Sequence, residues 1–134
     1  MRFISMVKYA EAEAAPPPKA FLEAMGRLSQ EAAQAGCLMT VGEGLLPTAA
    51  GARVRLNGGK VTVTDGPFTE AKEVVGGFAM FEAESKDEMV KWARRMCLHK
   101  THIPGWEGEC EIRQIAGPGK KLCDQVQDTE AASV

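Results

Sequence analysis

The chain has 134 residues, of which 45% are hydrophobic and 25% charged, with a formal net charge of -2 and an isoelectric point of about 5.7. These values fit one globular domain, and they argue against nucleic acid as a partner because no basic surface is available to neutralise phosphates. No apolar stretch reaches the length of a membrane span, and residues 1–8 lack the features of a secretory signal, so we expect a cytoplasmic protein without a membrane partner.

The N-terminal part of the chain predicts a strand, a helix and a second strand. Phe3 to Tyr9 is largely apolar on both faces of a strand, so both faces should be covered. The three prolines at 16–18 can begin a helix, and apolar residues at spacings of three and four continue it to about Ala35. Gly36 is a suitable helix stop, and Cys37 to Leu46 forms the second predicted strand.

A hairpin is predicted next. Residues 53–56 and 60–64 alternate cleanly around Asn57-Gly58-Gly59, a turn that tolerates positive φ. Val54 and Leu56 share one face of the first arm, and the arginines between them should meet water or a polar cavity.

The C-terminal part predicts a strand, a helix and a last strand. Gly77 to Ala83 is apolar on both faces, which suits a central, covered strand. Ser85 to Glu88 matches a capping box that begins a helix, and this helix should fray between His99 and Ile103. Glu109 to Ile115 is the last strand.

This order of elements predicts an α+β, ferredoxin-like βαββαβ fold with an inserted hairpin. Two helices would cover one face of the sheet, and a second copy of the sheet is the simplest cover for the other face. We therefore expect a homodimer. The predicted domain spans 1–117, and the polar residues 118–134 are expected to form a flexible C-terminal tail.

The run Asp65-Gly66-Pro67-Phe68-Thr69-Glu70-Ala71-Lys72-Glu73, followed by Gly76-Gly77-Phe78, is the most specific motif of the chain. It resembles the DGPFAETKE signature of the DGPF group within the YCII-related proteins. The resemblance covers roughly residues 1 to 117. It implies a dimeric α+β barrel, related to small enzymes that work without a cofactor, and we expect no cofactor here.

The resemblance implies no particular reaction for this chain. YCII proteins proper carry a His-Asp pair on the first helix that is proposed to be catalytic. Met25 and Gln34 stand at the matching positions here, and neither side chain can transfer protons.

The signature loop has two interpretations. In the structural one, Asp65, Gly66 and Pro67 form a rigid turn, and the loop packs Phe68 into the core. In the functional one, Asp65 is a general base or hydrogen-bond acceptor at the mouth of a pocket. That pocket would be lined by Thr69, Lys72 and Glu73.

His99 and His102 lie three residues apart, near one face of a helix if the helix persists. They are either acid–base histidines or an exposed pair at a frayed helix end. A structural zinc site needs four convergent ligands, and the chain has neither a CxxC nor an HExxH motif, so we expect no metal.

Charged residues also alternate along the last strand. Glu109, Glu111 and Arg113 lie opposite Cys110 and Ile112, so they would face the dimer side or a cavity. Such a stripe can anchor a ligand or form salt bridges between subunits. Tyr9, at the end of the first strand, could reach the same cavity.

The leading functional hypothesis is a small-molecule site between the helix layer and the sheet, with isomerase-type or lyase-type chemistry on a small organic acid or ring. Asp65 with His99 or His102 would transfer protons, and Arg113 or Lys72 would anchor an anion. The alternative is a non-catalytic regulatory or interaction protein. Its partner could be an extracytoplasmic-function sigma factor, because some proteins of the resembling family occur beside one.

Overall fold

The computed structural model describes residues 1–11, 16–68 and 72–117. The described strands are β1 (Arg2–Tyr9), β2 (Leu38–Gly44), β3 (Ala52–Asn57), β4 (Lys60–Asp65), β5 (Val74–Glu82) and β6 (Gly108–Gln114). The helices are α1 (Lys19–Gln34) and α2 (Lys86–Leu98), and two short 3-10 helices, η2 (Thr48–Ala50) and η3 (His99–His102), follow β2 and α2. The tail predicted for residues 118–134 lies outside the described residues.

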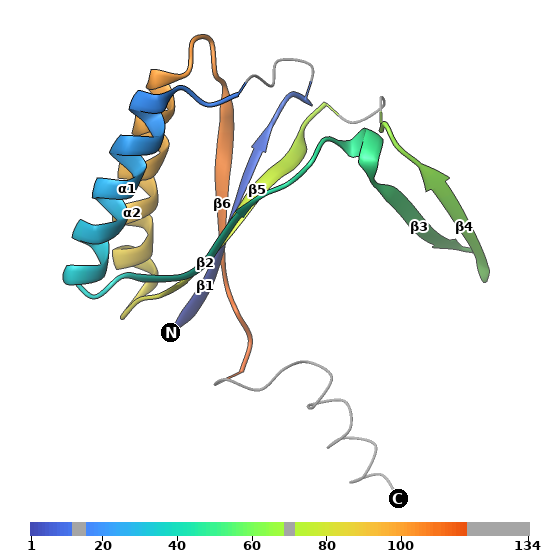
Figure 1. The fold of residues 1–134 in the computed structure, drawn as a ribbon. Helices are drawn as coiled ribbons and strands as arrows, with labels where there is room; N and C mark the ends of the chain where they lie inside the picture. Colours follow the sequence, from blue (N-terminus) through green and yellow to red (C-terminus); the bar gives the residue numbers. More distant parts are fainter. Residues whose placement is uncertain (12–15, 69–71, 118–134) are drawn as a thin grey trace, which may run out of the picture.

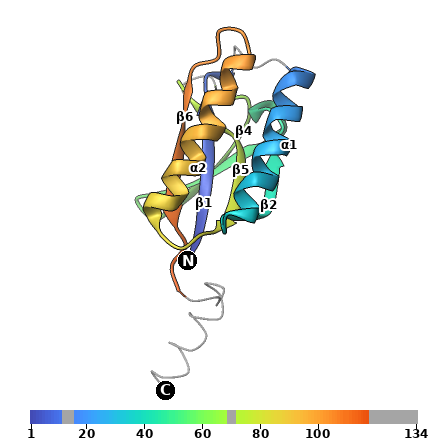
Figure 2. The ribbon, with the colours of Figure 1, turned by 90° about the vertical axis from the view of Figure 1, so that its left-hand side faces the viewer.

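Four strands form one antiparallel sheet in the order β2-β5-β1-β6, and β3 pairs with β4 in a separate hairpin. Both long helices lie on one face of the four-stranded sheet, as Figures 1 and 2 show. This α+β arrangement is compatible with the ferredoxin-like plan and the inserted hairpin predicted from the sequence. Within the described ranges, neither helix combines the length and the hydrophobicity needed to cross a lipid bilayer.

The ends of the helices follow local sequence signals. The Ser85 hydroxyl accepts a hydrogen bond from the Glu88 backbone N–H at 3.1 Å, which confirms the predicted cap of α2. Gly36 follows α1 with a φ of 95°, a conformation that glycine adopts without a steric penalty.

The core lies between the helices and the sheet. Phe3 on β1 pairs with Phe81 on β5, and both side chains point toward the helices and are almost fully buried. Leu28 of α1 and Met89 of α2 complete this layer. Trp92 is buried there too, and its indole N–H donates to Glu88 at 3.0 Å.

The opposite face of the sheet carries a half-buried apolar patch. Because side chains alternate along a strand, Ile4 and Met6 point away from the helices, as do Met80 and Phe78, which pair with them on β5. We call this surface, together with Val41 of β2, the open face. Both helices lie on the other side of the sheet, so the open face meets solvent in a single chain (Figure 1).

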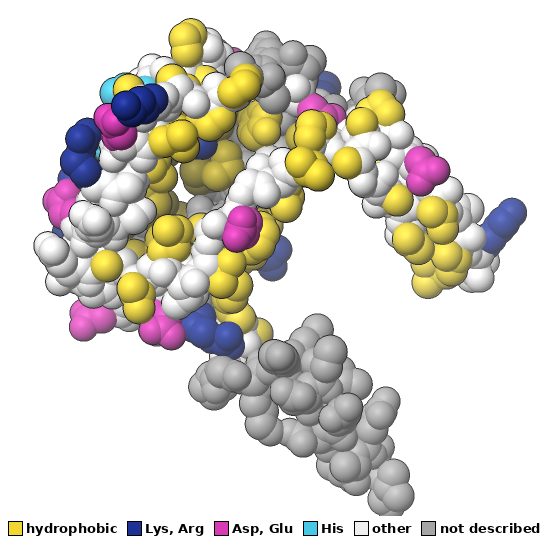
Figure 3. Space-filling view, viewed as in Figure 1, with side chains coloured by type: hydrophobic (Ala, Val, Ile, Leu, Met, Phe, Trp, Pro, Cys, Tyr) yellow, Lys and Arg dark blue, Asp and Glu magenta, His cyan; other side chains and the backbone are white. Residues whose placement is uncertain are grey.

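The β3–β4 hairpin, which we call the arm, projects from the body of the molecule on the side of the open face (Figure 1). The pairs Val54–Val63 and Leu56–Val61 place four apolar side chains on one face of the arm. Their relative exposures range from 61% to 73%. Figure 3 shows these hydrophobic side chains along the arm. The arm therefore leaves a continuous apolar surface uncovered.

The signature loop joins the arm to the body through η2. Gly66 donates its N–H to the Gly51 carbonyl at 2.9 Å, and Phe68 donates its N–H to the Thr48 hydroxyl at 3.2 Å. The Glu11 carboxylate accepts from both the backbone N–H and the hydroxyl of Thr48. The Gly66–Pro67 peptide bond is cis.

One detail of the structural interpretation is wrong. Phe68 does not join the core; it is half-buried at the root of the arm, where the Arg53 guanidinium lies 4.0 Å from its ring centre. The reason is that the loop packs on η2, outside the space between helices and sheet. The remaining chemistry of Asp65 to Phe68 agrees with a turn that anchors the arm.

Candidate functional site

A cavity of about 790 Å³ lies between the helix layer and the sheet. In Figure 3 it is seen as a hollow with hydrophobic walls. Its volume falls within the range of small-molecule sites, about 300–1,000 Å³. Three strands, β1, β2 and β5, form the floor of the cavity, α1 forms one wall, and the segment after α2 closes one end.

Apolar side chains dominate the walls of the cavity. Phe21 and Met25 contribute from α1, and Ala79 contributes from the sheet. At the closed end, Trp106 contacts Tyr9 with the two ring centres 6.5 Å apart. Such a surface suits the apolar body of an organic molecule, because its burial removes hydrophobic area from water.

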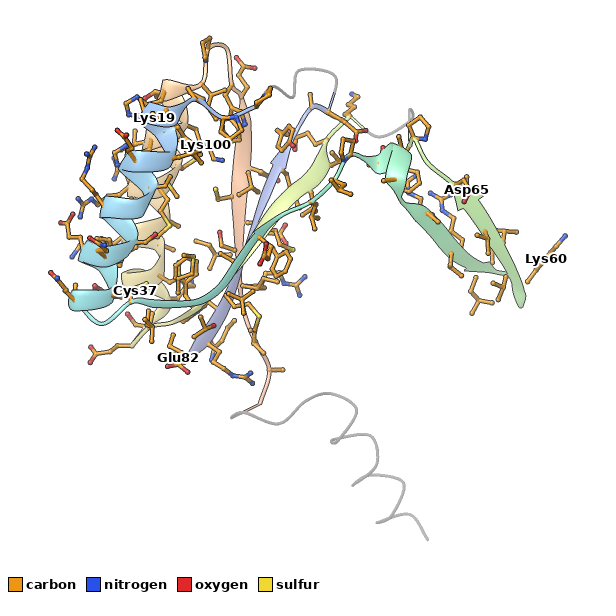
Figure 4. The ribbon with its side chains drawn as sticks, viewed as in Figure 1. Lys19, Cys37, Lys60, Asp65, Glu82 and Lys100 are labelled. Atoms are coloured by element: carbon orange, nitrogen blue, oxygen red, sulfur yellow. The ribbon has the colours of Figure 1, made fainter. Side chains whose placement is uncertain are left out.

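Lys100 is the cationic side chain among the described residues that line the cavity. It sits on η3, and its ammonium lies 4.6 Å from the ring centre of Phe21 and 5.3 Å from that of Trp106. Figure 4 shows Lys100 on the side of the helix layer that faces the sheet. Burial lowers the pKa of Lys100, because the apolar surroundings disfavour the charged form.

Two thiols, those of Cys97 and Cys110, lie near this ammonium. Burial is the main cause that raises the pKa of Cys110 to about 11, and the neighbouring Cys97 thiol acts in the same direction. Cys110 is therefore a neutral thiol at neutral pH. Cys110 lines the cavity as an uncharged wall residue and leaves the charge of Lys100 in place.

The structure does not bring the predicted acid–base residues together in one chain. Asp65 is exposed at the end of β4, on the arm, as Figure 4 shows. His99 and His102 stack on η3 with their ring centres 5.8 Å apart, and His102 is exposed. None of the three lines the cavity between helices and sheet. Their catalytic roles stay predictions.

The predicted ligand-binding residues fall in different places. Tyr9 lines the cavity, as expected. Arg113 pairs with Ile4 across β1 and β6, so it lies on the open face. Glu73 borders a smaller depression at the root of the arm, and Lys72 is exposed outside both hollows. Thr69 lies outside the described residues.

The charged stripe of β6 lies on the open face with Lys8. The Lys8 ammonium donates to Glu111 at 2.9 Å and lies 3.8 Å from Glu109. The hydrogen bond from Lys8 lowers the pKa of Glu111. These ion pairs form within one chain.

Sequence reasoning missed Lys100, although a signal for it was present. Met89, Ala93 and Met96 form the buried stripe of α2 at spacings of four and three. Lys100 comes four residues later and continues that stripe. A lysine at a position that continues the buried face of α2 therefore indicated a cation that faces the interior.

The region that builds this cavity also matches a known family. Residues 1–115 match the family model of the YCII-related domain. The chain belongs to the YCII-related family. Placement in the DGPF group stays a prediction that rests on the signature at residues 65–73.

A curated protein of Rhizobium meliloti (strain 1021), named "Uncharacterized protein R00369", is similar to this YCII-related chain. The two are 37% identical over 72 residues, which is 54% of this chain and 55% of that protein. The match thus spans about half of each sequence, and the name of the relative assigns no activity.

Proposed function

We propose that this YCII-related protein is a homodimer that binds a small organic molecule in the cavity between the helices and the sheet. The observation that carries the proposal is the cavity itself, with about 790 Å³ of space and predominantly apolar walls. A well-packed interior leaves few voids larger than a water molecule, so a space of this size at the centre of a fold supports a ligand site.

The proposal concerns binding and not a reaction. Isomerase or lyase chemistry needs a proton donor and acceptor within hydrogen-bond reach of the reacting atoms. Asp65, His99 and His102 do not line the cavity in one chain. The isomerase or lyase hypothesis therefore stays a prediction, whereas binding requires only the cavity and its walls.

Binding can be tested with N-phenylnaphthylamine, an uncharged fluorescent probe whose emission rises in apolar sites. We expect saturable fluorescence with the wild-type protein. Ala79→Leu should reduce it severalfold, because Ala79 lies on the floor of the cavity and the larger side chain would occupy probe volume. Circular dichroism would verify that the variant folds.

Ala20→Leu is the matched control, since Ala20 is exposed on α1 and does not line the cavity. It should leave probe binding unchanged. Absence of saturable binding to the wild type, or equal loss in both variants, would contradict a site in this cavity.

The homodimer proposal rests on two uncovered apolar surfaces. The open face presents Ile4, Met6 and Phe78 beside the ion pairs of Lys8, and the arm presents four exposed aliphatic side chains. Exposed patches of this kind usually mark interaction sites. A second copy of the chain supplies both an apolar sheet face and an apolar arm. In a symmetric dimer, each chain could therefore cover the apolar surfaces of the other.

Sedimentation at low micromolar protein concentrations tests this proposal, because it measures the oligomeric state. We expect the wild-type protein to be a dimer and Val63→Asp to shift it toward monomer, because a buried unpaired carboxylate is unfavourable at an apolar contact. Thr64→Asp is the control, because Thr64 pairs with Arg53 on the other face of the arm. A wild-type monomer would contradict the homodimer and favour a different protein partner, as the regulatory alternative expects.

A further inference from the structure

Lys100 brings a positive charge to the cavity, and no described carboxylate lies within ion-pair distance of its ammonium. Lys100 is half-buried against Phe21 and Trp106, and it forms no ion pair with a described residue. Cation–π contacts stabilise an ammonium modestly, by about 0.5–2 kcal/mol each. Removing a charge from water costs more than such contacts return unless the charge is also paired.

Two carboxylates also line the cavity, but neither of them pairs with Lys100. Glu43 and Glu107 are exposed and form no ion pair with Lys100. Cys110 is a neutral thiol because burial raises its pKa to about 11. An anion that enters the cavity beside Lys100 would therefore meet an ammonium that no described carboxylate pairs with.

Lys100 is also held at one end of the cavity and not at its centre. It belongs to η3, and its carbonyl accepts the N–H of Ile103 at 2.9 Å, in the turn that returns the chain to Trp106. The walls around the remaining space are mainly apolar, with Met25 and Ala79 among them. The site thus combines a charged end with an apolar body.

We propose that the cavity selects an amphipathic organic anion, a small acid with one negatively charged head and an apolar or aromatic body, and that Lys100 binds the head. This proposal rests on the cavity being a ligand site and adds the chemical class of the ligand. The apolar body would lie along Phe21 and Met25. An ammonium presents rotatable donors as a point charge, which suits a carboxylate or sulfonate head without demanding a fixed fork geometry.

Two fluorescent probes with the same aromatic body, one anionic and one uncharged, distinguish the effect of ligand charge from the effect of ligand shape. Anilinonaphthalene sulfonate carries an anionic head, and N-phenylnaphthylamine has the same ring system without it. We expect wild-type protein to bind the sulfonate more tightly than the amine. Lys100→Met should weaken sulfonate binding about tenfold, the effect of losing a hydrogen bond to a charged group. The same variant should leave binding of the uncharged amine unchanged or slightly tighter.

Three further variants serve as controls for charge and for location in the cavity. Lys100→Arg retains a cation and should preserve most of the preference for the sulfonate. Lys91→Met removes an exposed ammonium that stacks on Trp92 outside the cavity, so it should change neither probe. Ala79→Leu should reduce binding of both probes, which locates them in the cavity.

The outcomes distinguish this proposal from the function on which it rests. If both probes bind and Lys100→Met leaves the sulfonate affinity unchanged, the anion proposal is overturned while the ligand site stands. An equal loss of both probes in a folded Lys100→Met protein also overturns it, since the lysine would then shape the cavity. If neither probe binds the wild type, the ligand site itself fails.

Discussion

Phe3→Ala is expected to lower the free energy of unfolding by about 3–5 kcal/mol, the usual cost of removing a buried phenylalanine ring. Phe3 is almost fully buried and faces Phe81 across the central strand pair, under both helices. Typical domains have only about 5–15 kcal/mol of stability, so this single change removes a large part of it. Urea denaturation followed by circular dichroism measures the loss.

Ile4→Ala is the matched control, because Ile4 is the next residue on β1 and points to the open face. At low protein concentration it should cost clearly less than Phe3→Ala. If the open face is a dimer contact, the cost of Ile4→Ala should grow as the protein concentration rises, since association stabilises the folded state by mass action. Equal costs for both variants at every concentration would contradict the assignment of the two faces.

Gly66→Ala is expected to cost about 2–3 kcal/mol and to loosen the arm. A β-carbon at Gly66 would overlap the Thr48 carbonyl oxygen, far inside van der Waals contact. Because that oxygen belongs to the backbone of η2, the clash cannot be relieved by rotating a side chain. Chemical denaturation measures the loss of stability, and faster proteolysis within residues 52–65 would report the loosened arm.

Gly44→Ala controls for the general effect of replacing a glycine near the arm. A β-carbon at Gly44 meets no atom within 4 Å, so this change should be nearly neutral. A neutral Gly66→Ala would show that the signature loop does not hold the arm on η2. It would also remove the support for the structural interpretation of the DGPF motif over the functional one.

The sequence determined those parts of the structure that depend on local chemistry. The cap at Ser85, the stop at Gly36 and the hairpin turn were all predictable, because each is decided by a few neighbouring residues. The alternation of Phe3 and Ile4 predicted that β1 has two apolar faces. The order of elements then restricted the fold to one helix layer on an antiparallel sheet.

Tertiary structure decided where the candidate site lies. The cavity forms where α1, the sheet and the turn after α2 meet, and the distance between such distant segments follows from packing and not from local preference. The same packing places Lys100 inside the cavity and leaves Asp65 on the projecting arm. The signature loop and the histidine pair were predicted from the sequence to carry the chemistry. Only the non-local contacts determined which residues share one space, because burial and charge compensation depend on the assembled interior.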